Sequence, residues 1–286
     1  MVAALRSSAM APRVPLHLVG RGASSAPLCF SVVPRLISLY AKQQTSPFTK
    51  SQAPRFVPRL SVLEVERKFT PTSASIRQLD QNAGEPPFKS VLQTGVTCFE
   101  DTYYDTSDDI LSNAGVWIRC RKKFECGRLR FAPNASDPSS PHAVSWEAKI
   151  RLGGNFINSA FGEITDMQEI QATLSSLVPG AKLDGQYGPR GGHIRELARF
   201  VTNRTSYLVD GKFTVIIDVT DFGHTVGEVE LETEASETSC EGAGRTLAIA
   251  AMGEEVADLM RRFAWAFPPG TPVGKLSAYF DYRAKQ

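Results

Sequence analysis

The chain has 286 residues, of which 42% are hydrophobic and 22% charged, and its formal net charge is +2. This composition is typical of a globular protein with one large domain or two small ones. No apolar run approaches the roughly 20 residues that a membrane-spanning helix needs. The cysteine count is odd and no Cys-x-x-Cys pair occurs, which favours reduced thiols in an intracellular protein. The scattered histidines argue against a zinc site.

Residues 1–58 differ from the rest of the chain in charge. Eight Arg and Lys residues and no acid precede Glu64, so the remainder of the chain is net acidic. A leader rich in Arg, Ser, Ala and Pro without acidic residues matches a mitochondrial transit peptide. The alternatives are a disordered basic tail or a start codon placed too far upstream. We therefore expect a leader over 1–58, a single folded domain over 59–286, and a mitochondrial or otherwise cytoplasmic location.

The first half of the domain shows strand patterns and one short helix. Aromatic and β-branched residues between Thr97 and Tyr104 favour a strand there. Thr72 or Ser73 can cap a helix that ends near Gln81. The segment 132–142 has the composition of a surface loop. The strands expected in this half lie at residues 59–70, 95–105, 115–123 and 144–152.

The second half alternates strands with two longer helices. Asp166 can cap a helix that ends near Leu177, and an amphipathic pattern predicts a long helix near 241–264. Asp210-Gly211 is a hairpin signal. The strands expected here lie at residues 197–209, 213–219, 227–233 and, at the end of the chain, 275–280. One α+β domain with mostly antiparallel strands is the simplest account.

The most informative pattern is charge at alternate positions of predicted strands. Glu64, Glu66 and Lys68 share one face of the first strand, because side chains in a strand alternate between its two faces. Alone, this pattern indicates a polar strand facing water. It recurs, however, at Arg119 and Arg121, at Glu147, Lys149 and Arg151, and at Glu228, Glu230 and Glu232. The recurrence indicates a closed sheet with a charged inside and an apolar outside covered by helices.

The motifs that contain these charges occur in a recognisable order. They are Glu-Val-Glu-Arg-Lys at 64–68, Asp-Thr-Tyr-Tyr-Asp-Thr at 101–106, Trp-Ile-Arg-Cys-Arg at 117–121, Trp-Glu-Ala-Lys at 146–149, Asp-Phe-Gly at 221–223 with Gly-Glu-Val-Glu at 227–230, and Lys-Leu at 275–276. Together they resemble the CYTH, or triphosphate tunnel metalloenzyme, superfamily over nearly all of 59–286. The resemblance is nearest to its thiamine triphosphatase branch. It implies a closed eight-stranded antiparallel β-barrel with flanking helices, whose lumen binds a triphosphate and a divalent metal.

The resemblance also implies a role for each charged position. Hard Mg²⁺ prefers carboxylate and phosphate oxygens, and the expected metal ligands are Glu64, Glu66, Asp218, Glu228 and Glu230. An ungapped alignment with the family, however, places Ile216 and not Asp218 at one of the expected acidic positions. The expected phosphate clamp, which is also the catalytic set, is Lys68, Arg119, Arg121, Lys149, Arg204 and Lys275. Trp117 is the expected contact for a cationic thiazolium, unless it belongs to the core on the outside of the barrel.

The activity that the resemblance implies is metal-dependent hydrolysis of thiamine triphosphate to thiamine diphosphate and phosphate. Hydrolysis of inorganic or nucleoside triphosphates by the same lumen is an alternative, as is a protein that binds polyphosphate without catalysis. The last alternative leaves the carboxylates unexplained, because an anion binder needs cations and not five acids. We expect a monomer whose partner is a small-molecule triphosphate, with no nucleic-acid partner.

Overall fold

The computed structural model describes residues 58–125, 141–155, 157–184, 188–190, 194–235 and 242–286. The expected leader lies outside the described residues except for Pro58, and so does most of the loop expected at 132–142. No helix among the described residues is long and apolar enough to cross a membrane.

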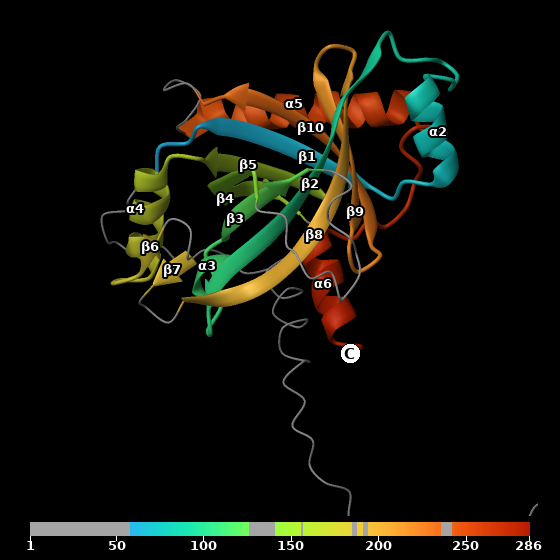
Figure 1. Ribbon diagram of the computed structural model, residues 1–286. Coiled ribbons are helices and arrows are strands. Elements are labelled where there is room, and N and C mark those ends of the chain that lie inside the picture. Colours follow the sequence, from blue (N-terminus) through green and yellow to red (C-terminus); the bar gives the residue numbers. More distant parts are fainter. Residues whose placement is uncertain (1–57, 126–140, 156, 185–187, 191–193, 236–241) are drawn as a thin grey trace, which may run out of the picture. The chain divides into compact units, whose positions relative to one another are not determined.

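A closed barrel of antiparallel strands forms the centre of the domain (Figure 1). The strand order around the barrel is β1-β10-β9-β8-β2-β3-β4-β5, and β5 pairs with β1 to close it. The predicted eight-stranded antiparallel barrel is confirmed. Its strands are β1 (Val62–Phe69), β2 (Val91–Thr106), β3 (Val116–Phe124), β4 (Ala143–Gly154), β5 (Asn158–Ile164), β8 (Ile194–Val209), β9 (Phe213–Thr220) and β10 (Thr225–Glu234).

The remaining elements flank the barrel. They are α2 (Ser73–Gln81), α3 (Ile110–Asn113), α4 (Met167–Leu177), α5 (Gly242–Arg262), α6 (Lys275–Arg283) and a two-stranded ribbon of β6 (Lys182–Asp184) and β7 (Gly188–Arg190). The two predicted caps are present. The Thr72 hydroxyl accepts a hydrogen bond from the Ser75 backbone N–H, and the Asp166 carboxylate accepts from the backbone of Gln168 and Glu169.

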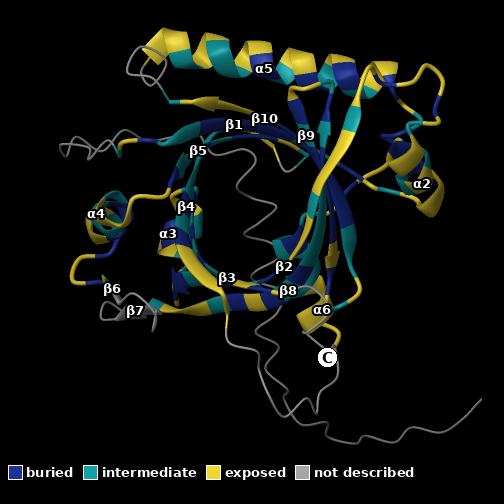
Figure 2. Ribbon diagram, turned by 45° about the horizontal axis from the view of Figure 1, so that its top comes forward, coloured by how far each residue is buried: buried dark blue, intermediate teal, exposed yellow. Residues whose placement is uncertain are grey.

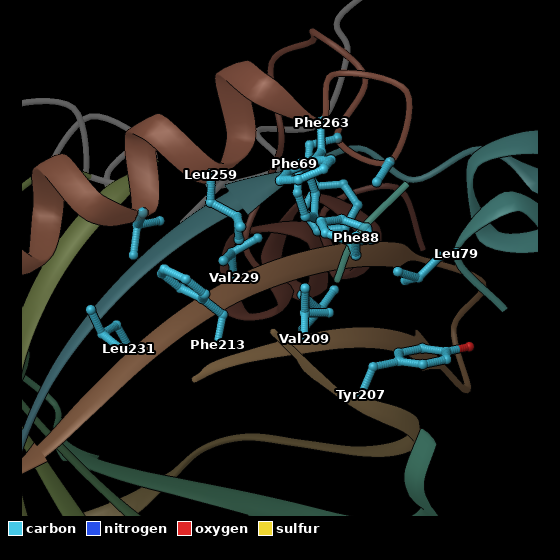
Figure 3. Close-up of a cluster of buried hydrophobic side chains, with 14 of the residues drawn as sticks. Phe69, Leu79, Phe88, Tyr207, Val209, Phe213, Val229, Leu231, Leu259 and Phe263 are labelled. Atoms are coloured by element: carbon cyan, nitrogen blue, oxygen red, sulfur yellow. The ribbon is translucent and has the colours of Figure 1, made fainter. Parts of the chain in front are cut away.

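The hydrophobic core lies outside the barrel wall, where helices cover the strands. Under α5, outward residues of β10 such as Val229 and Leu231 pack in one cluster with Leu259 and Phe263 (Figure 3). Figure 2 shows α5 lying across β1, β10 and β9 with exposed residues along its outer side. A second cluster joins β3, β4 and β5 to α3 and α4. Each fully buried aliphatic side chain stabilises the fold by about 1.5–3 kcal/mol. Since these clusters outside the barrel supply hydrophobic stabilisation, the inward positions need not be apolar and can carry charge.

The prediction of a final strand at 275–280 is wrong, because this segment is the helix α6. Tyr279 and Tyr282 are one helical turn apart, and both rings pack against Phe222, with ring centroids 5.7 and 5.5 Å away. Aromatic residues at this spacing fit a helix that docks on its neighbours. The eighth strand is instead β5, which the sequence pattern did not reveal.

Candidate active site

The inward positions of the barrel, together with Lys275 from α6, bring together every charged residue expected in the site. Alternation on β1 and β10 turns one row of each strand into the lumen, where Glu64 lies opposite Glu232, Glu66 opposite Glu230 and Lys68 opposite Glu228. Most outward aliphatic residues of the same strands belong to the core under α5, and Leu63 belongs to the second cluster. The lumen charges form three groups, described in turn: an acidic cluster, lysines bound to carboxylates, and arginines bound to aspartates.

The acidic cluster consists of Glu64, Glu66 and Glu230. One carboxylate oxygen from each lies within 4.8 Å of the others, and all three residues are buried. Burial raises the pKa of all three carboxyl groups, and the neighbouring Glu64 raises the pKa of Glu230 further. Buried carboxylates this close together are stable as anions only beside a cation. Oxygen donors of this kind match the preference of Mg²⁺.

The lysines of the lumen are bound to carboxylates. Lys149 Nζ lies 2.6 and 2.9 Å from the two Glu64 oxygens and 2.8 Å from Glu163 Oε1. Burial lowers the pKa of this ammonium group, but Glu64 and Glu163 outweigh it, and the pKa stands well above its usual value. Lys68 pairs with Glu66 and lies 3.6 Å from Glu228. Each lysine therefore stays charged between two acids.

Lys275 enters the lumen from α6 rather than from a strand. Its ammonium group pairs with Asp218 and lies 3.5 Å from Glu228. Burial alone would raise the pKa of the Glu228 carboxyl, but Lys275 and Lys68 hold it well below its usual range. Lys275 thus lies among the expected site residues, although the sequence pattern assigned this segment to a strand and its role stays a prediction.

Two arginines each donate two hydrogen bonds to one buried aspartate. Arg121 Nε and Nη2 each lie 2.7 Å from an oxygen of Asp101, and Arg204 Nε and Nη2 each lie 2.8 Å from an oxygen of Asp218. Both aspartates have an exposed fraction of 0%. Burial would raise the pKa of Asp101, yet Arg119 and Arg121 lower it. These bidentate pairs hold one edge of each guanidinium group.

Arg119 is held differently and keeps one nitrogen unpaired. Its Nη2 lies 2.6 Å from Glu147 Oε1, and its Nη1 lies 3.4 Å from the Tyr103 hydroxyl. Burial opposes ionisation of Glu147, but Arg119 and Lys149 lower its pKa to about 2. Among the described residues, the buried Nε of Arg119 has no hydrogen-bond partner. An unpaired buried donor of a cation suits an anionic ligand.

Asp218 and Ile216 both lie on the inward row of β9, so this row does not decide between them. Asp218 lies opposite Arg204 on one neighbouring strand and opposite Val226 on the other. Ile216, one inward step earlier, lies opposite Glu228. Asp218 and Glu228 are bound to cations and lie outside the three-residue acidic cluster, so their role as metal ligands stays a prediction.

Trp117 faces inward, and a different tryptophan belongs to the outer core. Trp117 lies opposite Lys149 in the β3–β4 ladder. Its ring meets that of Phe161 edge to face at a centroid distance of 5.8 Å, and Lys149 Nζ lies 5.3 Å from the same Phe161 ring. Trp146 is the tryptophan that packs on the outside of β4. The indole of Trp117 therefore lies beside the phosphate clamp.

Some lumen residues were missed from the sequence. Glu147 was visible in the alternating pattern, but Asp101, Glu163 and Thr202 carried no separate signal. Thr202 is buried, and among the described residues its hydroxyl has no hydrogen-bond partner. Asp101 becomes a site residue only because the β2–β3 register places it opposite Arg121.

Comparison with known families agrees with this geometry. The CYTH domain model matches residues 63–264, and the chain belongs to the CYTH domain family. The human thiamine-triphosphatase is 30% identical over 182 residues, which cover 59% of this chain and 67% of the human protein. The thiamine-triphosphatase of Macaca fascicularis is 27% identical over 186 residues, with the same coverage of 59% and 67%.

Two solved structures are similar to this chain over about three quarters of its length. The PH1819 protein of Pyrococcus horikoshii matches with a TM-score of 0.44 and 15% identity, covering 76% of this chain and 98% of that protein. A putative adenylyl cyclase from Hippeastrum, described as having a dominant triphosphatase activity, matches with a TM-score of 0.45 and 19% identity, covering 76% of this chain and 95% of that protein.

Proposed function

We propose that the chain hydrolyses thiamine triphosphate to thiamine diphosphate and phosphate in the barrel lumen. The observation that carries the proposal is an acidic cluster enclosed in the same lumen as six clamp cations. A polyanion alone would need the cations and not the acids. Two relatives that bear the name thiamine-triphosphatase support the choice of substrate.

The acidic cluster fits a divalent cation such as Mg²⁺. Glu64, Glu66 and Glu230 would hold it, with Glu228 and Asp218 as the further predicted ligands. When bound, the ion neutralises negative charge on phosphate oxygens. The cation also fits the electrostatics of the lumen, because burial and crowding raise the pKa values of the three carboxyl groups even with Lys149 and Lys68 beside two of them.

The clamp residues bind the phosphates and orient the terminal one. Arg grips phosphate oxygens with two parallel N–H groups, whereas Lys acts as a point charge. Each of these cations contacts a lumen carboxylate. A bound triphosphate adds contacts to the same groups. They stabilise the charge of the transferring phosphoryl group, and one lumen carboxylate orients the attacking water.

Trp117 supplies the preference for the thiamine ester. Its ring lies beside Lys149 and is half-buried. A thiazolium cation over an indole gains about 0.5–2 kcal/mol. We expect Trp117→Ala to lower kcat/KM for thiamine triphosphate roughly tenfold, since 1.4 kcal/mol corresponds to a factor of ten, without changing the value for inorganic triphosphate. Trp146→Phe, on the outside of the barrel, is the matched control.

The experiment that tests the proposal is phosphate release by the full chain with Mg²⁺. Thiamine triphosphate, inorganic triphosphate and ATP are compared by kcat/KM. A large preference for the thiamine ester supports the proposal. A preference for inorganic triphosphate or ATP would support the role of the clamp residues and contradict the contact between Trp117 and thiamine. Tight binding without turnover of any of the three would favour the non-catalytic alternative.

A further inference from the structure

Phe99 is an aromatic residue inside the charged lumen. It lies on β2 two residues before Asp101, on the same inward row, and has an exposed fraction of 1%. It belongs to neither of the two apolar clusters that pack outside the barrel. In the ladders of β2, Phe99 lies opposite Lys123 on one side and Thr202 on the other. Phe99 is therefore buried by contacts inside the barrel and not by the helix-covered core.

Two arginines of the clamp lie over this ring. Arg121 Cζ is 3.8 Å from the centroid of Phe99, and Arg204 Cζ is 5.3 Å from it. The arginines come from different strands, β3 and β8, which flank β2 on its two sides. Each guanidinium is thus held at its edge by an aspartate and faces the same phenyl ring. A single side chain contacts both cations.

A phenyl ring can orient a guanidinium without using its donors. The ring attracts the cation through its face and accepts no hydrogen bond from the N–H groups at the guanidinium edge. The hydrogen bonds of the described residues use Nε and Nη2 of both arginines, so Nη1 of each stays available for a phosphate oxygen. A third carboxylate in the place of the ring would cancel the charge that a phosphate needs.

We propose that Phe99 is a positioning residue that fixes the planes of Arg121 and Arg204 for phosphate binding. The inference rests on the proposed function, because it assumes that these two arginines bind the triphosphate. Phe99 does not touch the reacting atoms in this proposal. It acts by restricting two guanidinium groups that would otherwise lose orientational freedom when the ligand binds.

The experiment measures binding of inorganic tripolyphosphate to the full chain by titration calorimetry without metal, so that no turnover occurs. Phe99→Leu removes the ring and keeps an apolar side chain. We expect the dissociation constant to rise roughly tenfold, within the range of cation–π contacts to desolvated arginine. Phe213→Leu is the matched control, because Phe213 is a buried ring under α5 whose cation, Lys212, lies outside the lumen with Nζ 5.8 Å from the centroid. The control is expected to bind tripolyphosphate like the wild type.

A second measurement separates positioning from a general effect on the fold. Arg121→Lys keeps the charge but removes the planar guanidinium. If Phe99 acts through Arg121, the loss caused by Phe99→Leu is smaller in the Arg121→Lys background than in the wild type. Equal losses in the two backgrounds, or the same loss in Phe213→Leu, would overturn the inference.

Two further outcomes decide the remaining cases. If Phe99→Leu does not fold, as judged by circular dichroism, Phe99→Met fills a similar volume without an aromatic face, and unchanged affinity in that variant overturns the inference. Wild-type affinity in a folded Phe99→Leu protein does the same and leaves the proposed function intact. Failure of the wild-type chain to bind tripolyphosphate contradicts the proposed function itself, and with it the role of Phe99.

Discussion

The lumen contains two kinds of buried carboxylate, and they differ in the charge around them. Asp101 and Asp218 are each gripped by an arginine through two hydrogen bonds, and neighbouring cations lower their pKa values. Glu64, Glu66 and Glu230 crowd together, and burial raises their pKa values. Arginines therefore compensate the aspartates, whereas Lys149 beside Glu64 and Lys68 beside Glu66 do not outweigh the burial and crowding of the glutamates.

This difference separates two tasks within one barrel. Under the proposed function, the compensated aspartates would orient cations for an anionic ligand, and the crowded glutamates would hold a cation. Replacing a member of each group should accordingly have opposite consequences for the stability of the metal-free protein. The following variants test that contrast.

The largest effect is expected from removing two glutamates of the acidic cluster together. Glu64→Ala with Glu66→Ala should lower hydrolysis at saturating Mg²⁺ by about a thousandfold or more, equivalent to roughly 4 kcal/mol. Tripolyphosphate binding without metal should survive or tighten, because negative charge near the anion is lost. Glu254→Ala with Glu255→Ala, on the exposed side of α5, is the control. Wild-type turnover by the lumen double variant would show that these residues do not hold the metal.

Breaking a compensated pair should destabilise the fold. Asp101→Asn leaves Arg121 and Arg119 buried without their carboxylate, and removing one partner of a buried ion pair costs about 3–5 kcal/mol. Urea denaturation measures the free energy of unfolding. Glu196→Gln breaks an exposed pair with Arg199, and should change the stability by no more than about 1 kcal/mol. Equal effects of the two substitutions would mean that Asp101 does not hold the arginines.

Arg119 should affect both kinetic constants. Because its Nε lacks a partner among the described residues, we expect it to bind the ligand more directly than the other arginines do. Arg119→Ala should raise KM and lower kcat, with a combined loss in kcat/KM of roughly a hundredfold, or about 2.7 kcal/mol. Arg199→Ala on the outer surface is the control. Unchanged kinetics for Arg119→Ala would remove it from the clamp.

The smallest effect has the opposite sign to that of Asp101→Asn. Glu230→Gln keeps the shape of the side chain and removes a like charge from the position opposite Glu66. Like charges directly opposite in a ladder are destabilising, so this variant should stabilise the metal-free protein by about 1 kcal/mol in urea denaturation with a chelator present. A loss of stability would contradict the contrast between the two groups of carboxylates.

Most of the barrel could be predicted because the inward rows and the outward rows of its strands differ so strongly. Over residues 63–66 of β1 and 228–232 of β10, charged and aliphatic residues alternate, and period-two alternation is a local signal. In β5 the outward positions include Ala160 and Gly162, and the inward ones Ser159 and Phe161, so the contrast disappears. Gly162 is small for a reason beyond its own strand, because a Cβ there would lie 2.5 Å from the Leu60 side chain.

The site was less predictable than the fold where it depends on register. Glu66 and Lys68 could be found from their own strand. The pairing of Asp101 with Arg121, however, depends on the register of β2 against β3. That register is fixed by contacts throughout the sheet. The prediction of a strand at 275–280 was wrong for a similar reason. Tyr279 packs on Phe200 and Phe222, which are distant in sequence.

The seam between β1 and β10 has a consequence for the order of folding. It joins the first strand of the barrel to the last, and it also contains the facing pair Glu66 and Glu230. Closing so long a loop is slow, since its entropy is lost before the contacts form. The acidic cluster takes Glu64 and Glu66 from β1 and Glu230 from β10, so it is complete only when this seam is closed. The binding of a divalent cation proposed above would therefore report that the barrel has closed.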